Sequence, residues 1–144
     1  MDQVPSIQWF PGHMAKTRRL MKSNLPYVDI VVELRDAKIP QSSGNPELPQ
    51  LIGSKKPVVL LNKCDTADPE MTARWLQWFK RQGIAAIAVD SRSGKGLNAF
   101  LPLVREELSE LLARRAEKGA SGRPIRMMVV GIPNVGKSSF INRM

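Results

Sequence analysis

The segment Gly131-Ile-Pro-Asn-Val-Gly-Lys-Ser138 has the residue types and spacing needed to hold a chain of phosphates. Its glycines let the backbone wrap around phosphate oxygens so that the N–H groups point inward. Lys137 is expected to reach the β- and γ-phosphates, and Ser138 to offer its hydroxyl to magnesium at the start of a helix. A chance match of glycines is the alternative. The β-forming run Ile125–Val130 just before the segment favours a phosphate-binding loop.

A second motif, Asn62-Lys63-Cys64-Asp65, indicates which base accompanies those phosphates. A carboxylate at Asp65 can accept hydrogen bonds from the N1–H and the exocyclic amine of guanine, a donor pair that adenine lacks at that edge. Asn62 can bond the base and tie neighbouring loops together, and the stem of Lys63 can lie over the ring plane. Four-residue matches are common, but this one follows the apolar run Val58–Leu61 and shares a chain with the phosphate loop.

A third loop, Ser91-Arg-Ser-Gly-Lys-Gly96, could close over the guanine O6 through a backbone N–H. Most GTPases have Ser-Ala-Lys at this place, and here Arg92 stands in the alanine slot. That exchange is tolerable if only the N–H of Arg92 is used. An ordinary turn between a strand and a helix is the alternative reading of this segment.

Asn134 lies inside the phosphate loop, at a position where a subset of GTPases hold a potassium ion against the phosphates. Such an ion can neutralise developing charge where other GTPases use an arginine finger. Potassium is therefore expected at Asn134 and magnesium at Ser138. The expected nucleotide-binding residues are Asn62, Lys63, Asp65, Ser91, Arg92, Asn134, Val135, Gly136, Lys137, Ser138 and Ser139.

Strand-like and helical segments alternate along the chain, which predicts an α/β fold with a mostly parallel sheet flanked by helices, like that of P-loop NTPases. Four strands are expected, and by analogy with Ras-like topology their order in space is four-one-two-three. The outer edge of the fourth strand is expected to be bare. The predicted strands are Asp29–Arg35, Val58–Leu61, Ile84–Val89 and Ile125–Val130.

Four helices are expected between and before these strands. They are a basic amphipathic helix at Met14–Leu25 that Pro26 ends, a short helix around Glu47–Ile52, a helix capped by Asp68-Pro69 that stops at Gly83, and one long helix from Leu97 to about Lys118. Met71, Trp75, Trp78 and Phe79 recur at helical spacing in the third of these. We interpret the three aromatic side chains among them as core rather than as a platform for nucleic acid.

The charge balance favours an anionic partner. Lys and Arg total 22 against 13 Asp and Glu, a formal charge of +9, and nucleic acid is favoured over membrane because no lipid-facing helix stands out. A soluble basic surface without a partner is the alternative. No apolar window of about 18 residues predicts a membrane span. The single cysteine, Cys64, and the lack of leader features at the N-terminus predict a cytoplasmic protein.

Taken together, these motifs resemble the circularly permuted GTPases of ribosome assembly, and most closely the ribosome biogenesis GTPase A (YlqF-type) family. The guanine tetrad precedes the phosphate loop, the reverse of the usual GTPase order. The opening Gln8-Trp-Phe-Pro-Gly-His-Met-Ala-Lys16 looks like the start of that family. Asp36-Ala-Lys-Ile-Pro40 resembles its Asp-Ala-Arg-Ile-Pro motif, with Lys38 in place of arginine.

The resemblance implies GTP hydrolysis coupled to late maturation of the large ribosomal subunit, with rRNA as the partner surface. It also implies that His13 is the catalytic residue that handles the attacking water, a role that glutamine has in Ras-like proteins. An imidazole can orient or deprotonate water near neutral pH. Without the family, a histidine after Pro-Gly is more often a turn or packing residue.

Family members continue with switch segments and a helical RNA-contacting domain, so the chain is expected to be a truncated part of such a protein. Residues 1–26 are expected to form a basic arm and residues 27–144 a partial GTPase domain that binds guanine nucleotide weakly and hydrolyses it near background. An inert fragment is one alternative. The other is a non-catalytic RNA-binding module that uses Lys16, Arg18, Arg19, Lys22, Arg114, Arg115, Lys118, Arg123 and Arg126.

Overall fold

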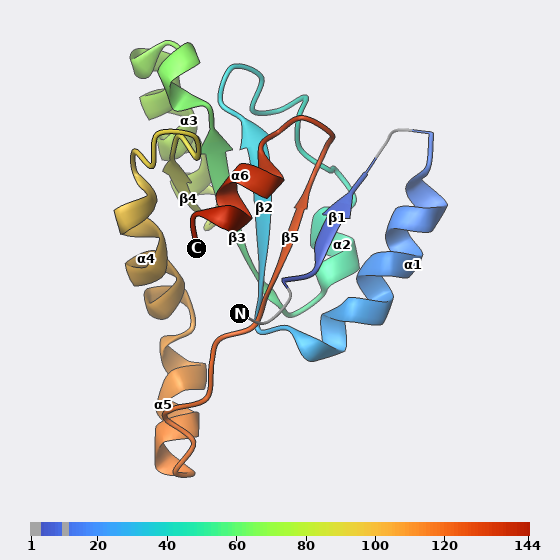
Figure 1. The fold of residues 1–144 in the computed structure, drawn as a ribbon, viewed down its shortest axis with the longest axis vertical. Helices are drawn as coiled ribbons and strands as arrows, with labels where there is room; N and C mark the ends of the chain where they lie inside the picture. The colour runs from blue at the N-terminus through green and yellow to red at the C-terminus, as the bar shows by residue number, and fades with distance from the viewer. Residues whose placement is uncertain (1–3, 10–11) are drawn as a thin grey trace.

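Five parallel strands form a single sheet in the order β1-β5-β2-β3-β4 in the computed structural model, which describes residues 4–9 and 12–144 (Figure 1). The longest register joins the two central strands, from Ile30 opposite Lys56 to Asp36 opposite Asn62. The strands are β1 (Ser6–Gln8), β2 (Ile30–Asp36), β3 (Lys56–Asn62), β4 (Ala85–Ala88) and β5 (Met127–Gly131).

Helices cover both faces of this sheet. On one face Met21, Leu48 and Phe79 are the buried contacts of the first three helices, and on the other Phe100 and Phe140 meet edge-to-face at 5.1 Å. The first three helices are α1 (Met14–Asn24), α2 (Leu48–Ile52) and α3 (Pro69–Arg81). The others are α4 (Phe100–Glu107), α5 (Ser109–Glu117) and α6 (Lys137–Asn142), and short 3-10 turns lie at Leu25–Tyr27, Cys64–Thr66 and Leu97–Ala99.

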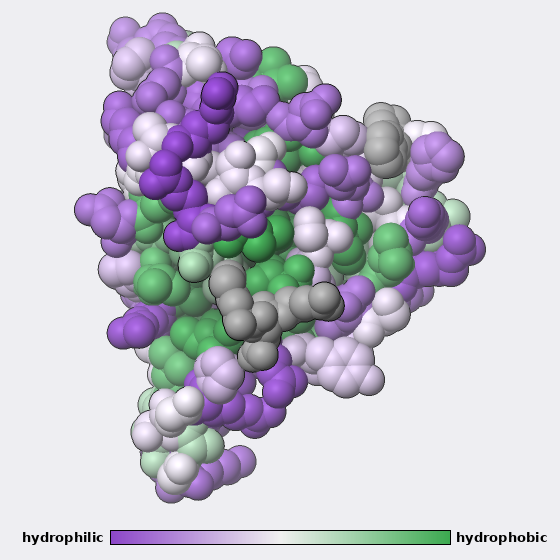
Figure 2. Space-filling view, in the orientation of Figure 1, coloured by the Kyte–Doolittle hydropathy of each residue, from purple (hydrophilic) through white to green (hydrophobic). Residues whose placement is uncertain are grey.

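The face that carries α4 and α6 is shown in Figure 2, where apolar side chains gather in the centre and polar ones surround them. Its fully buried part is built from β-branched and leucine side chains of the strands together with the two phenylalanines. Valine and isoleucine dominate because strands of a parallel sheet are covered on both faces. The buried residues of this cluster are Ile30, Val32, Leu34, Val58, Leu60, Val89, Phe100, Val104, Leu108, Val129, Val135 and Phe140.

The four strands expected from the sequence are confirmed, and so is their order in space, which is β5-β2-β3-β4. The cap of α3 is also confirmed, since the side chain of Asp68 accepts a hydrogen bond of 3.0 Å from the Glu70 N–H and Pro69 begins the helix. The prediction of one long helix from Leu97 to about Lys118 is wrong. The backbone departs from helical angles at Leu108 (φ −102°, ψ 17°), which separates α4 from α5.

The expected bare edge beside β5 was also wrong, because β1 occupies it. Ile7 pairs with Val130, and the N–H of Trp9 donates to the Gly131 carbonyl at 3.2 Å. Ile7 is buried against Met21 of α1, so the short strand and the helix after it pack as one unit on the sheet. The strand has three residues, too few for an alternating pattern to be recognised in the sequence.

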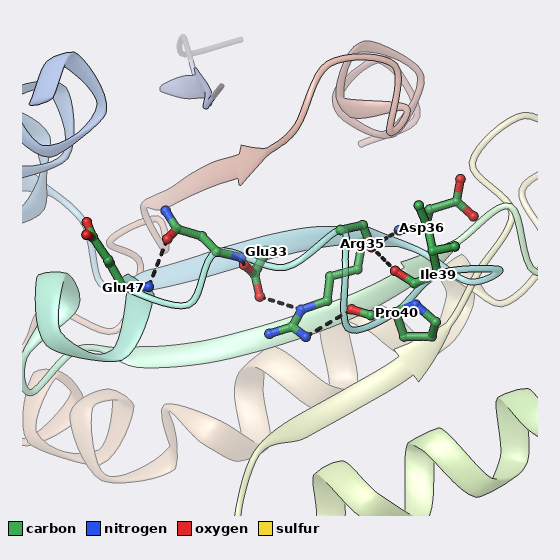
Figure 3. A network of polar contacts seen from close by, with 8 residues as sticks. Glu33, Arg35, Asp36, Ile39, Pro40 and Glu47 are labelled. Atoms are coloured by element: carbon green, nitrogen blue, oxygen red, sulfur yellow. Dashed lines mark hydrogen bonds and ion pairs between the residues drawn. The ribbon is translucent and has the colours of Figure 1, made fainter. Parts of the chain in front are cut away.

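A fully buried carboxylate, Glu33, lies in the central strand β2 (Figure 3). Glu33 and Arg35 share one face of the strand because side chains alternate with a period of two. Arg35 Nε donates to Glu33 Oε1 at 2.7 Å, and the N–H of Asn45 donates to Oε2 at 2.8 Å. The carboxylate is therefore neutralised by one cation and also bonded by backbone, as a buried charge requires.

The same pair holds the loop of residues 37–47 against the sheet. Arg35 Nη1 donates to the Pro40 carbonyl at 3.0 Å, and its guanidinium lies 5.1 Å from the centre of the Phe79 ring. Gly44 passes so close that a Cβ there would lie 2.4 Å from the Arg35 Cζ. The loop after β2, which contains the Asp36–Pro40 motif, is thus fixed by a buried charge beneath it.

Replacing Glu33 with alanine is expected to destabilise the fold by about 3–5 kcal/mol, because Arg35 and the Asn45 N–H lose their acceptor inside the protein. The matched control is Arg18→Ala, which removes an ion pair with Glu47 whose side chains are 43% and 38% exposed. That change should cost less than about 1 kcal/mol. Urea unfolding monitored by circular dichroism gives both values, and equal losses would contradict the role of Glu33.

Candidate nucleotide site

Three loops meet at the edge of the sheet where the strands end. They follow β3 (residues 63–68), β4 (residues 89–96) and β5 (residues 132–136), and all three lie toward the top of Figure 1. Parallel strands present their carboxyl ends on one side, which is where ligands bind in open α/β sheets. The tetrad, the Ser91 loop and the phosphate loop therefore share one edge.

Asn62, the last residue of β3, joins all three loops through its side-chain amide. Its Nδ2 donates to the Val135 carbonyl at 2.8 Å, and its Oδ1 accepts from the Ser91 N–H at 2.9 Å and the Ser91 hydroxyl at 3.0 Å. Asn62 and Ser91 are 2% and 1% exposed. The expected tie between neighbouring loops is present, and it is made inside the protein where these bonds have no competition from water.

Gly136 is required by this contact. Its φ is 97°, and a Cβ there would lie 2.2 Å from the Asn62 Nδ2. Only glycine takes that backbone angle without strain and lets the amide approach. Asn134 also has a positive φ, 65°, which asparagine tolerates better than most residues. The loop thus contains two residues with a left-handed backbone, Asn134 and Gly136.

Lys137 begins α6 and points back into the phosphate loop. It is 5% exposed, and its Nζ donates to the carbonyls of Gly131 at 3.4 Å and Ile132 at 3.5 Å. Burial lowers the pKa of this ammonium group. Both bonds are long for a charged donor, so phosphate oxygens would offer shorter, charge-assisted partners at the same place.

The tetrad contacts the phosphate loop a second time through Lys63. This residue has a left-handed φ of 61°, and its Nζ donates to the carbonyl of Asn134. The stem of Lys63 therefore spans from the base-reading motif to the phosphate loop. Asp65 lies in the next turn, where its side chain is 48% exposed and 3.4 Å from Lys95 Nζ.

The loop after β4 is ordered by its own hydrogen bonds. The N–H groups of Asp90 and Gly94 donate to the carbonyls of Lys95 and Asp90, at 2.9 and 2.8 Å. A hydrogen bond from Ser93 lowers the pKa of the Asp90 carboxyl. Arg143, just after α6, donates to the Arg92 carbonyl and so links this loop to the helix after the phosphate loop.

Cys64, in the variable slot of the tetrad, is half-buried. Burial, and secondarily the charge of Asp65, raises the pKa of its thiol. A thiol with a raised pKa is a poor nucleophile at neutral pH. The side chain of Cys64 packs against the buried cluster of Val59, Leu61 and Phe79.

Most of the predicted residues lie on or directly beside these three loops, whereas His13 lies just before α1. His13 precedes α1 and lines a hollow of about 430 Å³ with Ser6, Gln8, Lys16, Thr17 and Leu20, none of which belongs to the phosphate loop. Ser138 and Ser139 lie in the first turn of α6, directly after Lys137. Residues 10 and 11 of the opening motif lie outside the described residues.

Sequence reasoning missed Lys95 and Arg143. Lys95 pairs with Asp65, and the signal for it was its place between Gly94 and Gly96 in a loop already assigned to the base. Arg143 has no such signal, because its contact with Arg92 joins segments 51 residues apart.

No cluster of three or more His, Cys, Asp or Glu side chains suited to a metal occurs among residues 4–9 and 12–144. The fit for magnesium therefore rests on the exposed Ser138 hydroxyl beside the loop that would hold the phosphates. Nor does any helix in the described part of the chain have the length and apolarity to cross a membrane.

Comparison with known proteins finds relatives that match nearly the whole chain. The chain is 52% identical over 140 residues to ribosome biogenesis GTPase A of Priestia megaterium and 48% over 139 residues to that of Bacillus pumilus, matching 96% of this chain and 49% of each relative. It is 37% identical over 137 residues to mitochondrial ribosome-associated GTPase 1 of Xenopus tropicalis, covering 94% of this chain and 43% of that protein. No protein-family model matches the chain.

Two solved structures of YlqF are similar to this fold. The GDP-bound structure of TM YlqF has a TM-score of 0.63 at 31% identity, and GNP-bound YlqF from T. maritima has 0.62 at 32%. The matches cover 85% and 88% of this chain and 46% of each of those chains. The resemblance inferred from the motifs is confirmed over nearly all of the chain, which spans about half the length of the ribosome biogenesis GTPase A relatives.

Replacing Asn62 with alanine is expected to destabilise the protein by about 2–4 kcal/mol, because the Val135 carbonyl and the Ser91 N–H lose their partner in a buried place. Ser91→Ala is the matched control, since it removes only the hydroxyl bond and should cost about 0.5–1.5 kcal/mol. Urea unfolding measures both. Hydrogen exchange at the Ser91 N–H should speed up only in the Asn62 variant, and unchanged exchange there would count against the link.

Proposed function

We propose that this chain is the guanine-nucleotide-binding part of a ribosome-assembly GTPase, starting from its similarity to ribosome biogenesis GTPase A over 96% of its length. The observation that carries the proposal is the set of hydrogen bonds from Asn62 to Val135 and Ser91. These bonds bring the motif that selects guanine and the loop that suits phosphates to one edge. A single nucleotide can then contact both.

In the proposed complex, the two ends of the site have different tasks. Asp65 accepts hydrogen bonds from the N1–H and the exocyclic amine of guanine, the Lys63 stem lies against the ring, and the N–H of Arg92 faces O6. The Asp65–Lys95 pair is exposed and weak, so the base can replace Lys95 at the carboxylate. At the other end the N–H groups of the loop and the ammonium group of Lys137 hold the phosphates.

Two cations complete the proposal. Magnesium would be held by the Ser138 hydroxyl and the phosphates themselves, and it would neutralise charge on them. Potassium would be held at Asn134, whose side chain is exposed at the mouth of the loop and whose carbonyl is already bonded to Lys63. Supplying that charge in place of an arginine finger would make turnover depend on potassium.

The proposed partner is the large ribosomal subunit, through its rRNA, in the cytoplasm. The support is the net charge of +9 and the relatives named for ribosome biogenesis or ribosome association. The alternative function, a non-catalytic RNA-binding module, has less support. Two of the residues it would use are already paired, Arg18 with Glu47 and Arg115 with Asp29, and Arg115 is 12% exposed.

Asp65→Asn is expected to weaken binding of GDP by on the order of 100-fold, because both hydrogen bonds from guanine lose their charged acceptor. The same change should improve binding of xanthosine diphosphate, whose C2 carbonyl can accept from the new amide. Titration with fluorescent analogues of the two nucleotides checks this. Asp68→Asn, in the cap of α3, is the matched control and should leave both affinities as they are.

If the Asp65 variant lost affinity for GDP and for xanthosine diphosphate equally, this carboxylate would support the loop and would not select the base. A wild-type chain that binds adenosine diphosphate as well as GDP would refute the guanine assignment itself.

Hydrolysis is proposed to depend on His13. This residue lies four positions after Trp9, whose N–H donates to the carbonyl of Gly131 at the start of the phosphate loop. His13→Ala, made in a protein with the full length of the relatives, should leave GTP affinity nearly intact and lower turnover by about 100-fold, the usual scale for a group that handles the attacking water. Phosphate release measured in potassium and in sodium buffers gives both tests. An unchanged rate in the variant would remove His13 from the reaction, and equal rates in the two salts would remove the potassium.

A further inference from the structure

Helix α3 presents tryptophans outward as well as inward. Its inner side buries Thr72 and Phe79, while Met71 and Trp78 remain 47% and 40% exposed. The expectation that the aromatic side chains of this helix are core was therefore wrong for Trp78. An exposed apolar patch of this kind on an otherwise charged helix calls for an explanation.

The exposed side chains line a groove of about 380 Å³ between α3 and the loop of residues 37–47. Along the helix they follow one another at intervals of three and four, which places them on a single stripe. The lining residues are Gln41, Met71, Arg74, Trp75, Trp78 and Arg81.

The rings in this groove are held in fixed orientations. Trp78 meets Trp75 edge-to-face at 5.6 Å and Phe79 edge-to-face at 5.1 Å, and Phe79 lies against the Arg35 guanidinium. Gln41, on the opposite wall, belongs to the loop that Glu33 and Arg35 hold down. A rigid ring that is partly exposed can stack on a flat ligand without losing much conformational freedom.

The charged side chains of the groove are both positive. Arg74 and Arg81 line it and no carboxylate does, while Glu70 pairs with Arg74 outside it, with both side chains largely exposed. Tryptophan faces combined with arginines suit a ligand that carries flat rings and negative charge on one strand. An acidic peptide offers the charge but not a regular series of flat rings.

We infer that the groove formed by Trp75, Trp78, Arg74 and Arg81 binds single-stranded RNA, with a base stacked on Trp78 and phosphates facing the arginines. The choice of RNA rests on the proposed ribosomal role, whereas the groove rests on the geometry of α3. This surface is distinct from the nucleotide site, because no lining residue belongs to the three loops that meet at Asn62.

The test is fluorescence anisotropy of a labelled, unstructured 12-nucleotide RNA with the 144-residue chain. Trp78→Ala should weaken binding about tenfold, the usual effect of losing one stacked base. Arg81→Gln should weaken it several-fold and make the salt dependence shallower by about one phosphate contact. Arg81 is exposed, so this variant keeps the test valid if the tryptophan variant melts early by circular dichroism.

Two matched controls distinguish RNA binding in the groove from the general effect of losing a positive charge or an exposed apolar side chain. Lys80→Gln removes the same charge one residue away, from a different hollow lined by Leu76 and Ile84. Leu101→Ala removes a side chain that is 52% exposed on α4. The inference is overturned if Trp78→Ala and Arg81→Gln weaken RNA binding no more than these controls, or if a glutamate-rich peptide and not RNA depends on Trp78.

The two proposals fail separately. The Trp78 and Arg81 variants should keep wild-type affinity for GDP, and Asp65→Asn should keep wild-type affinity for the RNA. A wild-type chain that does not bind GDP would refute the proposed function, and it would leave the RNA-binding inference for the groove unaffected. Normal GDP binding with no RNA dependence on the groove would refute the inference alone.

Discussion

The side-chain amide of Asn62 is the constraint on which the site depends. It is buried at the end of β3, and it must donate to one loop and accept from another at the same time. A carboxylate could not donate to the Val135 carbonyl, and an apolar side chain would leave the Ser91 N–H without a partner. The amide in turn requires Gly136, because any Cβ there would occupy its space. One residue thus sets the distance between the two ends of the site.

A second buried polar group, the ion pair of Glu33 and Arg35, also holds a loop in place, but away from the site. Its charges are neutralised within the sheet, and its remaining bonds are used to hold backbone at Asn45 and Pro40. The loop of residues 37–47 has few apolar side chains with which to anchor itself, so the buried ion pair replaces a hydrophobic anchor. Through Phe79 the same arginine also supports the aromatic groove on α3.

The sequence predicted the parts of this fold that rest on local patterns. The four longer strands, the Asp68 cap and the order of motifs could be read because each leaves a periodic or positional signal. What failed needed tertiary information. β1 is too short for a pattern, and the helix break at Leu108 has no glycine or proline to mark it. Trp78 fits the helical period, but the period does not say that the sheet beneath α3 has room for Phe79 and not for Trp78.

The two ends of the site differ in how strongly their charged groups are buried. Lys137 is almost fully buried and its pKa is lowered, so its charge is poorly solvated until an anion lies beside it. In the proposed complex, a phosphate beside Lys137 would relieve that cost and add to the affinity for the nucleotide. Asp65 is half exposed and paired only weakly with Lys95, so little free energy would be lost if guanine displaced the lysine, as proposed. In the proposed complex, a carboxylate so placed would favour guanine, whose two donors it accepts, and would penalise adenine, which offers it no donor pair. The proposal therefore gives the phosphate loop the task of holding the ligand and gives Asp65 the task of selecting the base.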